Sequence, residues 1–370
     1  MRVDRYENLP DEETTTEARP SPFELSNQNA ATILGEDQPR FRVTQIKEGL
    51  FKGFIAPWDN MTLPKNLRSR LRDQMYLSAE SAFVVSTDQG RTRKAVLTLR
   101  DDSKIETVLM CYRKRDTVCV STQLGCAMGC VFCATGQGGF GRHLRVSEMQ
   151  EQFFWASKEL REIDPTKRIT NVVLMGMGEP LANYDNTLAF VRSLISEFQL
   201  GARSITLSTV GVVPGILKLA EEDLQVNLAV SLHAPDNETR DQIVPINRRY
   251  SIDALIESLH QYRTKSRRRV TLEYALIDKV NDSPEQMRQL TVIAKELRAH
   301  VNLIPLNSTP MYDYPGSPPE TVARCKEILS NNSVNVTVRD TRGSDIAAAC
   351  GQLVVQSDKL RVRRASVPTS

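Results

Sequence analysis

The sequence predicts an α/β fold in which a small helical accessory domain precedes an open, partial βα barrel of about six parallel strands. Apolar strand-like runs alternate with amphipathic helical stretches from Val118 onward, which is the rhythm of a parallel βα architecture. Roughly six or seven such units are too few to close an eight-stranded barrel. Polar motifs follow several of the strands, at the edge where parallel sheets place their ligand sites.

The first 80 residues are expected to divide into two parts. Residues 1–21 are polar and rich in threonine and glutamate, with few large apolar side chains, so we expect this segment to be disordered. Residues 22–80 show amphipathic helical patterns, as in 42–54 and 63–75, and are predicted to form the accessory domain.

Residues 81–115 are predicted to be a strand-rich extension that leads into the barrel. Strand-like runs cover 82–86, 94–99 and 105–110, and Asp88-Gln89-Gly90 supplies a turn between the first two.

Residues 116–355 are predicted to form the barrel core. Expected strands cover 118–122, 170–175, 204–208, 226–232, 270–277, 301–306 and 334–339. Expected helices include 146–160, 253–262, 284–298 and 319–329. After residue 355 the composition becomes polar and basic, so 356–370 is expected to be a flexible tail.

Composition and charge limit the protein's environment. The chain has 370 residues and a net charge of +3, which is too small to indicate a nucleic-acid partner. Basic runs at 65–72, 263–269 and 359–364 make a polyanionic partner reasonable, although each run alone is typical of a solvated surface. No apolar run is long enough to span a bilayer, and the polar N-terminus is not a secretory signal. Three clustered cysteines indicate a reducing compartment, so we expect a cytoplasmic protein without a membrane partner.

Three cysteines, Cys126, Cys130 and Cys133, form a C-x3-C-x2-C triplet in the loop after the first barrel strand. A closed zinc site takes four ligands, whereas three thiolates can hold a 4Fe-4S cluster and leave one iron open. Gly125 and Gly129 provide the flexible backbone that a cluster loop needs. The spacing resembles that of the radical S-adenosylmethionine (SAM) enzymes. Buried structural thiols, half of a zinc site and disulfide partners are the alternatives.

Other candidate ligands follow later strands. The loop Gly176-Met177-Gly178-Glu179-Pro180 resembles the loop that binds the amino-acid end of SAM, with Gly178 and Glu179 as its binding residues. The remaining candidates offer hydroxyl, imidazole or amide groups to the SAM carboxylate, ribose or adenine, and Leu232 is included as part of the Ser231-Leu232-His233 motif. They are Ser208, Ser231, Leu232, His233 and Asn307. A lone histidine such as His233 is more often structural.

Four cysteines lie outside the triplet. Cys119 precedes the first cluster ligand, and Cys350 ends a run of small residues near the C-terminus. From the residues alone, such unpaired cysteines are more often inert than catalytic. Cys111 and Cys325 belong to no motif, and we expect both to be structural.

Together these features resemble the adenine-methylating radical SAM methyltransferases of the RlmN/Cfr type. The resemblance covers about residues 80 to 355, and both family cysteines outside the cluster, Cys119 and Cys350, are present. Leu306 stands where we expect an aromatic residue, and Val210 where we expect a small polar one. The matching segments are 105–108, 119–126, 133–140, 145–148, 176–181, 207–209, 231–235, 243–247 and 345–353.

The resemblance implies a mechanism that uses two SAM molecules per turnover and one 4Fe-4S cluster. Cys350 is the implied methyl carrier, whose methylene radical adds to carbon 2 of adenine and joins RNA to protein. Glu106 is the implied proton acceptor. Cys119 is the implied resolving thiol, which forms a disulfide with Cys350 and frees the methylated base.

The resemblance also implies the substrates and partners. These are an adenosine of 23S rRNA at the peptidyl transferase centre, the adenosine at position 37 of tRNAs, and an electron donor of the flavodoxin or ferredoxin type. We expect a monomer whose helical domain contacts RNA. The sequence of residues 133–140 and the long N-terminal extension favour methylation of carbon 2. The alternative is methylation of carbon 8, as by the Cfr-like resistance enzymes. A radical SAM activating enzyme and a non-catalytic, metal-bound RNA-binding module are alternatives from other classes.

Overall fold

The computed structural model describes residues 19–309, 312, 314–339 and 343–353. Most of the segment predicted to be disordered, and the predicted basic tail, lie outside the described residues. The prediction of disorder is wrong for Ser21, which is buried and caps a short helix, with its side chain accepting a hydrogen bond from the Phe23 backbone N–H.

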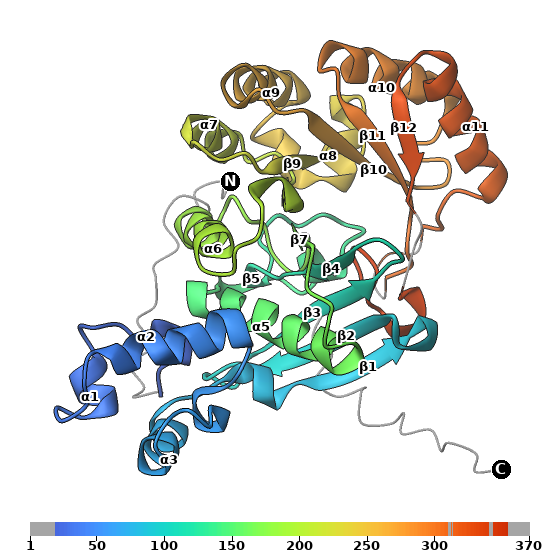
Figure 1. Ribbon diagram of the computed structural model, residues 1–370. Helices are drawn as coiled ribbons and strands as arrows, with labels where there is room; N and C mark the ends of the chain where they lie inside the picture. Colours follow the sequence, from blue (N-terminus) through green and yellow to red (C-terminus); the bar gives the residue numbers. More distant parts are fainter. Residues whose placement is uncertain (1–18, 310–311, 313, 340–342, 354–370) are drawn as a thin grey trace, which may run out of the picture.

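Ten strands form one sheet in the order β1-β2-β3-β4-β7-β8-β9-β10-β11-β12 (Figure 1). Neighbours from β1 to β4 pair antiparallel, and those from β4 to β12 pair parallel. No pairing joins β12 to β1 in the part of the chain that the structure describes, so the predicted open barrel is confirmed. The strands are β1 (Phe83–Thr87), β2 (Thr92–Thr98), β3 (Lys104–Cys111), β4 (Asp116–Cys119), β7 (Asn171–Leu174), β8 (Ile205–Thr209), β9 (Asn227–Ser231), β10 (Val270–Leu276), β11 (His300–Pro305) and β12 (Asn335–Val338).

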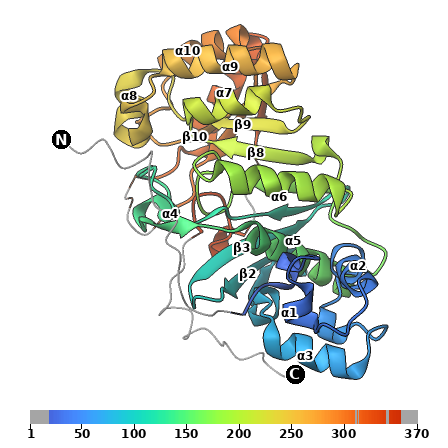
Figure 2. The same cartoon turned by 90° about the vertical axis from the view of Figure 1, so that its left-hand side faces the viewer.

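Helices lie outside the parallel strands, as Figure 2 shows for α6, α7, α9 and α10. Each strand is joined to the next by a crossover through a helix, which is the connection that parallel pairing requires. The helices of the barrel are α4 (Ala134–Gln137), α5 (Val146–Ile163), α6 (Tyr184–Ser196), α7 (Val213–Glu221), α8 (Asn237–Ile243), α9 (Ile252–Ser266), α10 (Pro284–Glu296) and α11 (Pro319–Asn331). None of the described helices is long and apolar enough to cross a membrane.

The predicted barrel strands are all present, with ends shifted by a few residues. The sequence did not reveal a short hairpin, β5 (Gln123–Gly125) and β6 (Phe140–His143), which brackets the cysteine triplet. Strands this short carry no alternation that could be recognised, because their pairing depends on how the loop closes. β1 to β3 are not detached from the barrel, since β3 pairs directly with β4.

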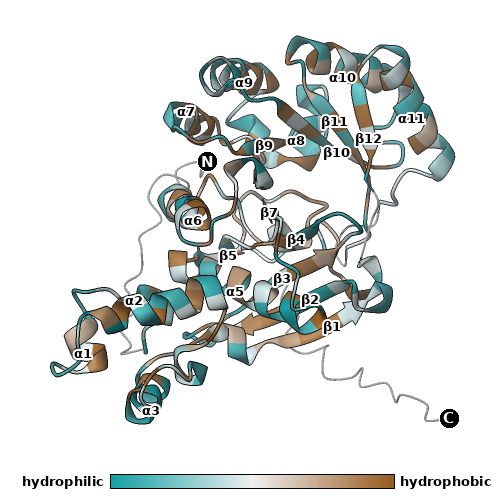
Figure 3. Ribbon diagram, in the orientation of Figure 1, coloured by the Kyte–Doolittle hydropathy of each residue, from teal (hydrophilic) through white to brown (hydrophobic). Residues whose placement is uncertain are grey.

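The strands of the sheet contain many hydrophobic residues, drawn in brown in Figure 3, whereas the helices carry both hydrophobic and hydrophilic residues. The buried positions of the strands are mostly valine, leucine and isoleucine, which suit strands covered on both faces. Val118, Leu207, Leu228, Leu272 and Leu303 are all buried to 1 % exposure or less. Such strands cannot bury charged groups cheaply, so the polar side chains are displaced to the strand ends.

Two short 3-10 turns of the N-terminal region, Pro22–Glu24 and Ser78–Ser81, contact α5. The N-terminal helices lie on the same side of the sheet as α5, as Figure 1 shows. They are α1 (Ala30–Leu34), α2 (Phe41–Glu48), which continues as a π-helical turn over Gly49–Gly53, and α3 (Lys65–Gln74). Phe23 contacts Phe154 of α5 edge to face, with ring centroids 5.8 Å apart. Inside this apolar contact, the Glu151 carboxylate of α5 accepts hydrogen bonds from the hydroxyls of Ser21 and Ser78 and, at 2.7 Å, from the Ser78 backbone N–H.

Glu151 is expected to make this packing pH-dependent. Burial raises the pKa of Glu151 from 4.5 to about 7, so the folded state favours the protonated acid. The stability this preference contributes is complete below about pH 4.5 and is lost as the pH rises through 7, a loss on the order of 3 kcal/mol. Thermal unfolding at pH 5.5 and 8 should show a smaller pH difference for Glu151→Gln than for the wild type.

Glu162→Gln is the control for that comparison, because Glu162 is exposed on the same helix. It should keep the wild-type pH difference. An equal pH difference in wild type and Glu151→Gln would show that Glu151 does not titrate in this range.

Candidate active site

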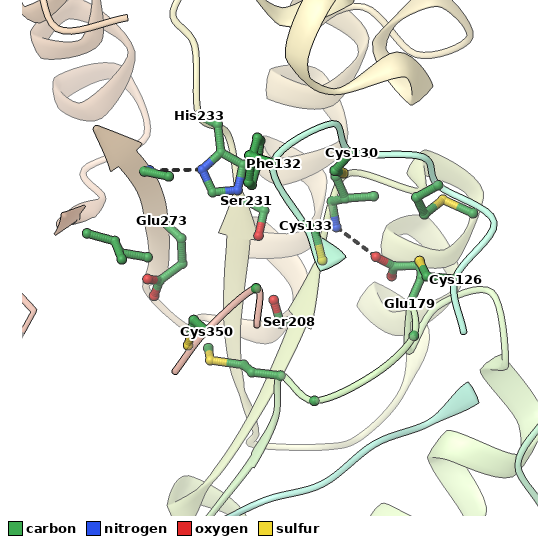
Figure 4. A pocket seen from close by; sticks show the side chains of 18 of the residues that line it. Cys126, Cys130, Phe132, Cys133, Glu179, Ser208, Ser231, His233, Glu273 and Cys350 are labelled. Carbon is green, nitrogen blue, oxygen red and sulfur yellow. Dashed lines mark hydrogen bonds between the residues drawn. The ribbon is translucent and has the colours of Figure 1, made fainter. Parts of the chain in front are cut away.

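A cavity of about 170 Å³ opens at the carboxyl ends of β7 to β11, the edge predicted from the sequence (Figure 4). Each of these strands contributes residues to the wall, and the cysteine loop closes one side. The lining residues include Cys126, Cys130, Cys133, Gly178, Glu179, Ser208, Ser231, His233, Glu273, Asn307, Arg339 and Cys350.

The cysteine loop owes its shape to close backbone packing. Gly125 has a φ of +76°, and a Cβ there would lie 2.0 Å from the Gly139 carbonyl oxygen. The two segments lie this close together because the Cys126 N–H donates a hydrogen bond to the same Gly139 oxygen at 2.7 Å. The following turn rests on α8, where the Val131 N–H donates to the Ile243 carbonyl at 3.2 Å. Gly125 is therefore required for the loop to close.

The three thiols fit a cluster better than a single ion. Burial raises the pKa of Cys126 to about 12 and raises the pKa values of Cys130 and Cys133, so a bound cation is needed for them to ionise. Among the described residues, no three His, Cys, Asp or Glu side chains converge on a site for one metal ion. Ligands of a 4Fe-4S cluster bind separate irons and do not have to converge on one point.

Glu179 is fixed by the loop that carries it. Its carboxylate accepts hydrogen bonds from the backbone N–H groups of Val210 at 2.8 Å and Leu181 at 3.0 Å. Burial raises its pKa to about 7. Gly178 has a φ of +101°, and a Cβ there would lie 2.7 Å from the Gln123 nitrogen. The loop therefore holds a buried carboxylate on the cavity wall, where an ammonium group would favour its ionised form.

His233 is a neutral donor on the opposite wall. Its Nδ1 accepts a hydrogen bond from the Ala275 N–H at 3.0 Å, so the ring proton is on Nε2. Burial lowers its pKa to about 3. The Phe132 ring of the cysteine loop meets the imidazole edge to face, with centroids 4.9 Å apart.

Five of the predicted SAM contacts besides Glu179 line the cavity, and one does not. Gly178, Ser208, Ser231, His233 and Asn307 are on the wall. The side chain of Leu232 is instead part of the barrel's apolar core, and its carbonyl accepts a hydrogen bond from Arg240 Nε at 2.9 Å. Leu232 shares the motif of Ser231 and His233, but alternation along the chain turns its side chain away from the cavity.

Cys350 stands between two cavities. It lines the main cavity and also a smaller one of about 30 Å³ that is lined by Cys119. The Cys350 segment is tied to the cysteine loop, since the Ala134 N–H donates to the Gly351 carbonyl at 2.8 Å. Asn307 Nδ2 donates to the Cys350 carbonyl at 3.1 Å. Burial raises the pKa of Cys119 to about 12, with a further increase from Cys350.

Glu106 lies beside the Cys350 segment but lines neither cavity. Its carboxylate is 3.0 Å from Lys94 Nζ in an ion pair whose side chains are 1 % and 5 % exposed. Lys94 Nζ also donates to the Ala347 carbonyl at 3.1 Å. Lys94 thus connects the carboxylate to the segment that carries Cys350.

Two charged residues of the wall were missed from the sequence. Glu273 accepts a hydrogen bond from Asn302 Nδ2 at 2.8 Å and lies 4.0 Å from Arg339 Nη1. Burial raises the pKa of Glu273, and the pKa of Arg339 is raised chiefly by Cys350. The signal for Glu273 was available, because it is a lone charge within the apolar run Val270 to Leu276. Arg339 lines both cavities.

An open parallel barrel with three cysteines at its strand ends defines a radical SAM enzyme. The profile of the Radical SAM superfamily matches residues 120–291. A solved radical SAM methyltransferase from Sphaerobacter thermophilus is 44 % identical, with a TM-score of 0.83 over 91 % of this chain and 98 % of that one.

Curated relatives define the family within this class. A probable dual-specificity RNA methyltransferase RlmN from Dictyoglomus thermophilum is 47 % identical over 87 % of this chain and 92 % of that protein. One of the same name from Chloroflexus aurantiacus is 47 % identical over 85 % of this chain and 87 % of its own. The chain belongs to the RlmN family.

Replacing a cluster cysteine should remove the metal. Cys126→Ala, Cys130→Ala and Cys133→Ala are each expected to lose most of the iron and sulfide bound after anaerobic reconstitution, because a cluster needs all three thiolates. Iron and sulfide analysis measures the loss. Cys111→Ala is the control, since Cys111 is on β3 and lines neither cavity. Wild-type iron in two of the three variants would overturn the ligand assignment.

Proposed function

We propose that the protein methylates carbon 2 of adenosine in both 23S rRNA, at the peptidyl transferase centre, and tRNA, at position 37. The observation that carries the proposal is the position of Cys350. Its thiol is on the wall of the cavity that also holds Cys126, Cys130 and Cys133, and it shares the second cavity with Cys119. A methyl carrier needs two kinds of neighbour. The cluster site would load and activate the methyl group, and a second thiol, Cys119, would release the product.

The wall residues divide between the two cofactors. Cys126, Cys130 and Cys133 would hold the 4Fe-4S cluster, and Gly178, Glu179, Ser208, Ser231, His233 and Asn307 would hold SAM. When bound, these groups supply one electron and a carbon-centred radical that removes hydrogen from a methyl group.

Cys350 is the nucleophile, because carbon 2 of adenine lies between two ring nitrogens and is too electron-poor to take a methyl cation itself. Its sulfur accepts a methyl group from one SAM. After losing a hydrogen atom, the S-methylene carbon bonds to carbon 2, which joins RNA to protein.

Glu106 and Cys119 would complete the reaction. Glu106, whose carboxylate is paired with Lys94, would accept the proton from carbon 2, and the unpaired electron left on the adduct would return to the cluster. Cys119, whose thiol is protonated in the free protein, then loses its proton and attacks the Cys350 sulfur. The new disulfide forms as the carbon–sulfur bond breaks, and the departing carbon takes the electron pair and a proton to become the methyl group. A reductant must restore both thiols.

The helical domain is the proposed RNA contact outside the cavity. Leu67 and Leu71 bury one face of α3, while Lys65, Arg70 and Arg72 are exposed. The second basic run, 263–269, ends α9 and precedes β10, so it lies at the amino end of a strand, away from the cavity. We assign the RNA contact to the exposed basic residues of α3.

The remaining partners follow from the chemistry. The electron is proposed to come from a flavodoxin or ferredoxin-type donor, and the protein is proposed to work as a cytoplasmic monomer. All seven cysteines are free thiols in the structure, as a reducing compartment requires.

Mass spectrometry of nucleosides tests the proposal directly. The reconstituted protein is incubated without oxygen with SAM, a reductant, and either ribosomal RNA or tRNA. Methyladenosine substituted at carbon 2 is expected from both RNAs. Methyladenosine substituted at carbon 8 would assign the chain to the Cfr-like resistance enzymes. Release of 5′-deoxyadenosine without methyladenosine would show that these RNAs are not the substrates.

Loss of the resolving thiol should trap the adduct. Cys119→Ala is expected to accumulate protein covalently bound to RNA on a denaturing gel and to lower product release by at least about tenfold. Cys350→Ala should form neither adduct nor product, and Cys111→Ala should behave as wild type. Free methylated RNA released by Cys119→Ala at the wild-type rate would contradict the assigned role.

A further inference from the structure

Arg240 on α8 is a cation without exposed surface, at 0 % exposure, and it is the largest fully buried side chain in the described structure. Its Nε donates to the Leu232 carbonyl at 2.9 Å, and its Nη1 to Asn247 Oδ1 at 2.9 Å. Its Nη2 donates to the carbonyls of Val210 at 2.7 Å and Ser231 at 3.3 Å. All of these acceptors are neutral oxygens.

The guanidinium makes no ion pair within the described residues. The carboxylate next to it in the chain, Asp241, instead accepts a hydrogen bond from Asn247 Nδ2 at 2.6 Å. Burial lowers the pKa of Arg240 to about 10, which reflects the cost of keeping this charge out of water. Buried charges are normally retained only where an opposite charge compensates them.

The cysteine loop supplies that opposite charge when it carries metal. The loop packs directly on α8, since Met128 and Phe132 share an apolar cluster with Ile243 and Val244. Arg240 lies one turn before Ile243 on α8, and the Ile243 carbonyl accepts a hydrogen bond at 3.2 Å from the N–H of Val131, the residue after Cys130. The cation therefore lies behind the wall formed by this loop and the ends of β8 and β9, and it does not itself line the cavity.

We propose that Arg240 is the fixed counter-charge of the iron–sulfur cluster, a positioning residue that favours the cluster's reduced state. The inference rests on the cluster that the proposed function requires. A 4Fe-4S core held by three thiolates carries net negative charge, and one-electron reduction adds to it. A cation fixed in a low-dielectric interior stabilises the more negative state more strongly, and its cost is offset once the cluster is present.

The rival role for Arg240 is purely structural, as a tie between the ends of β8 and β9 through its carbonyl contacts. Two substitutions separate the roles. Arg240→Lys keeps the charge but cannot reproduce the planar set of hydrogen bonds, whereas Arg240→Gln removes the charge and keeps a donor. Arg248→Gln is the control, because Arg248 is an exposed arginine at the end of the same segment.

The test is the midpoint potential of the reconstituted cluster, followed by redox titration with electron paramagnetic resonance. Arg240→Gln should lower the equilibrium constant for reduction by at least tenfold, a shift of about 59 mV to more negative potential. Arg240→Lys and Arg248→Gln should stay near wild type. Equal shifts in the Gln and Lys variants, or no shift in either, would overturn the proposal.

Thermal unfolding gives a second readout that does not depend on the potential. Reconstitution with iron and sulfide should raise the melting temperature of the wild type more than that of Arg240→Gln, because only the wild type gains charge compensation. An equal rise in both would contradict the proposal. Neither measurement uses RNA, so a failure of methyl transfer to carbon 2 and a failure of this inference are seen in separate experiments.

Discussion

The site depends on the attachment of the C-terminal segment to the cysteine loop. The Ala134 N–H donates to the Gly351 carbonyl at 2.8 Å, and the Thr135 hydroxyl donates to the Leu353 carbonyl at 2.6 Å. These bonds satisfy backbone groups that would otherwise be buried without partners, and they place Cys350 on the wall beside the cluster cysteines. These bonds therefore hold the proposed methyl carrier on the cavity wall.

Buried charges mark the functional edge of the barrel. Glu179, Glu273 and Arg240 are all at or behind the carboxyl ends of the strands, and each has a pKa shifted by burial. Such groups cost stability in an interior of valine and leucine. In the free protein their cost is offset by hydrogen bonds, from backbone N–H groups for Glu179, to backbone carbonyls for Arg240 and from the Asn302 side chain for Glu273. Under the proposed function, charged ligands would offset it further, and the site would be most stable when occupied.

Cys119 and Cys350 lie in different surroundings, which suits the separate roles proposed for them. Cys119 is on β4, inside the sheet, where burial keeps its thiol protonated. Cys350 is on an irregular segment held by a few hydrogen bonds, between the two cavities. A thiol fixed within a strand beside one on an irregular segment that lines both cavities suits the exchange proposed between Cys119 and Cys350.

The sequence by itself determined the parallel barrel, the cysteine triplet and the loops after each strand, because apolar alternation and glycine-rich motifs are local signals. It also ranked Cys350 as functional, but only through a family resemblance. The tertiary structure alone decided that Leu232 faces the core, that Glu106 pairs with Lys94, and that Glu273, Arg339 and Arg240 surround the site. These relations join residues far apart in the chain, and their energies depend on burial and neighbouring charge, which a local pattern does not contain.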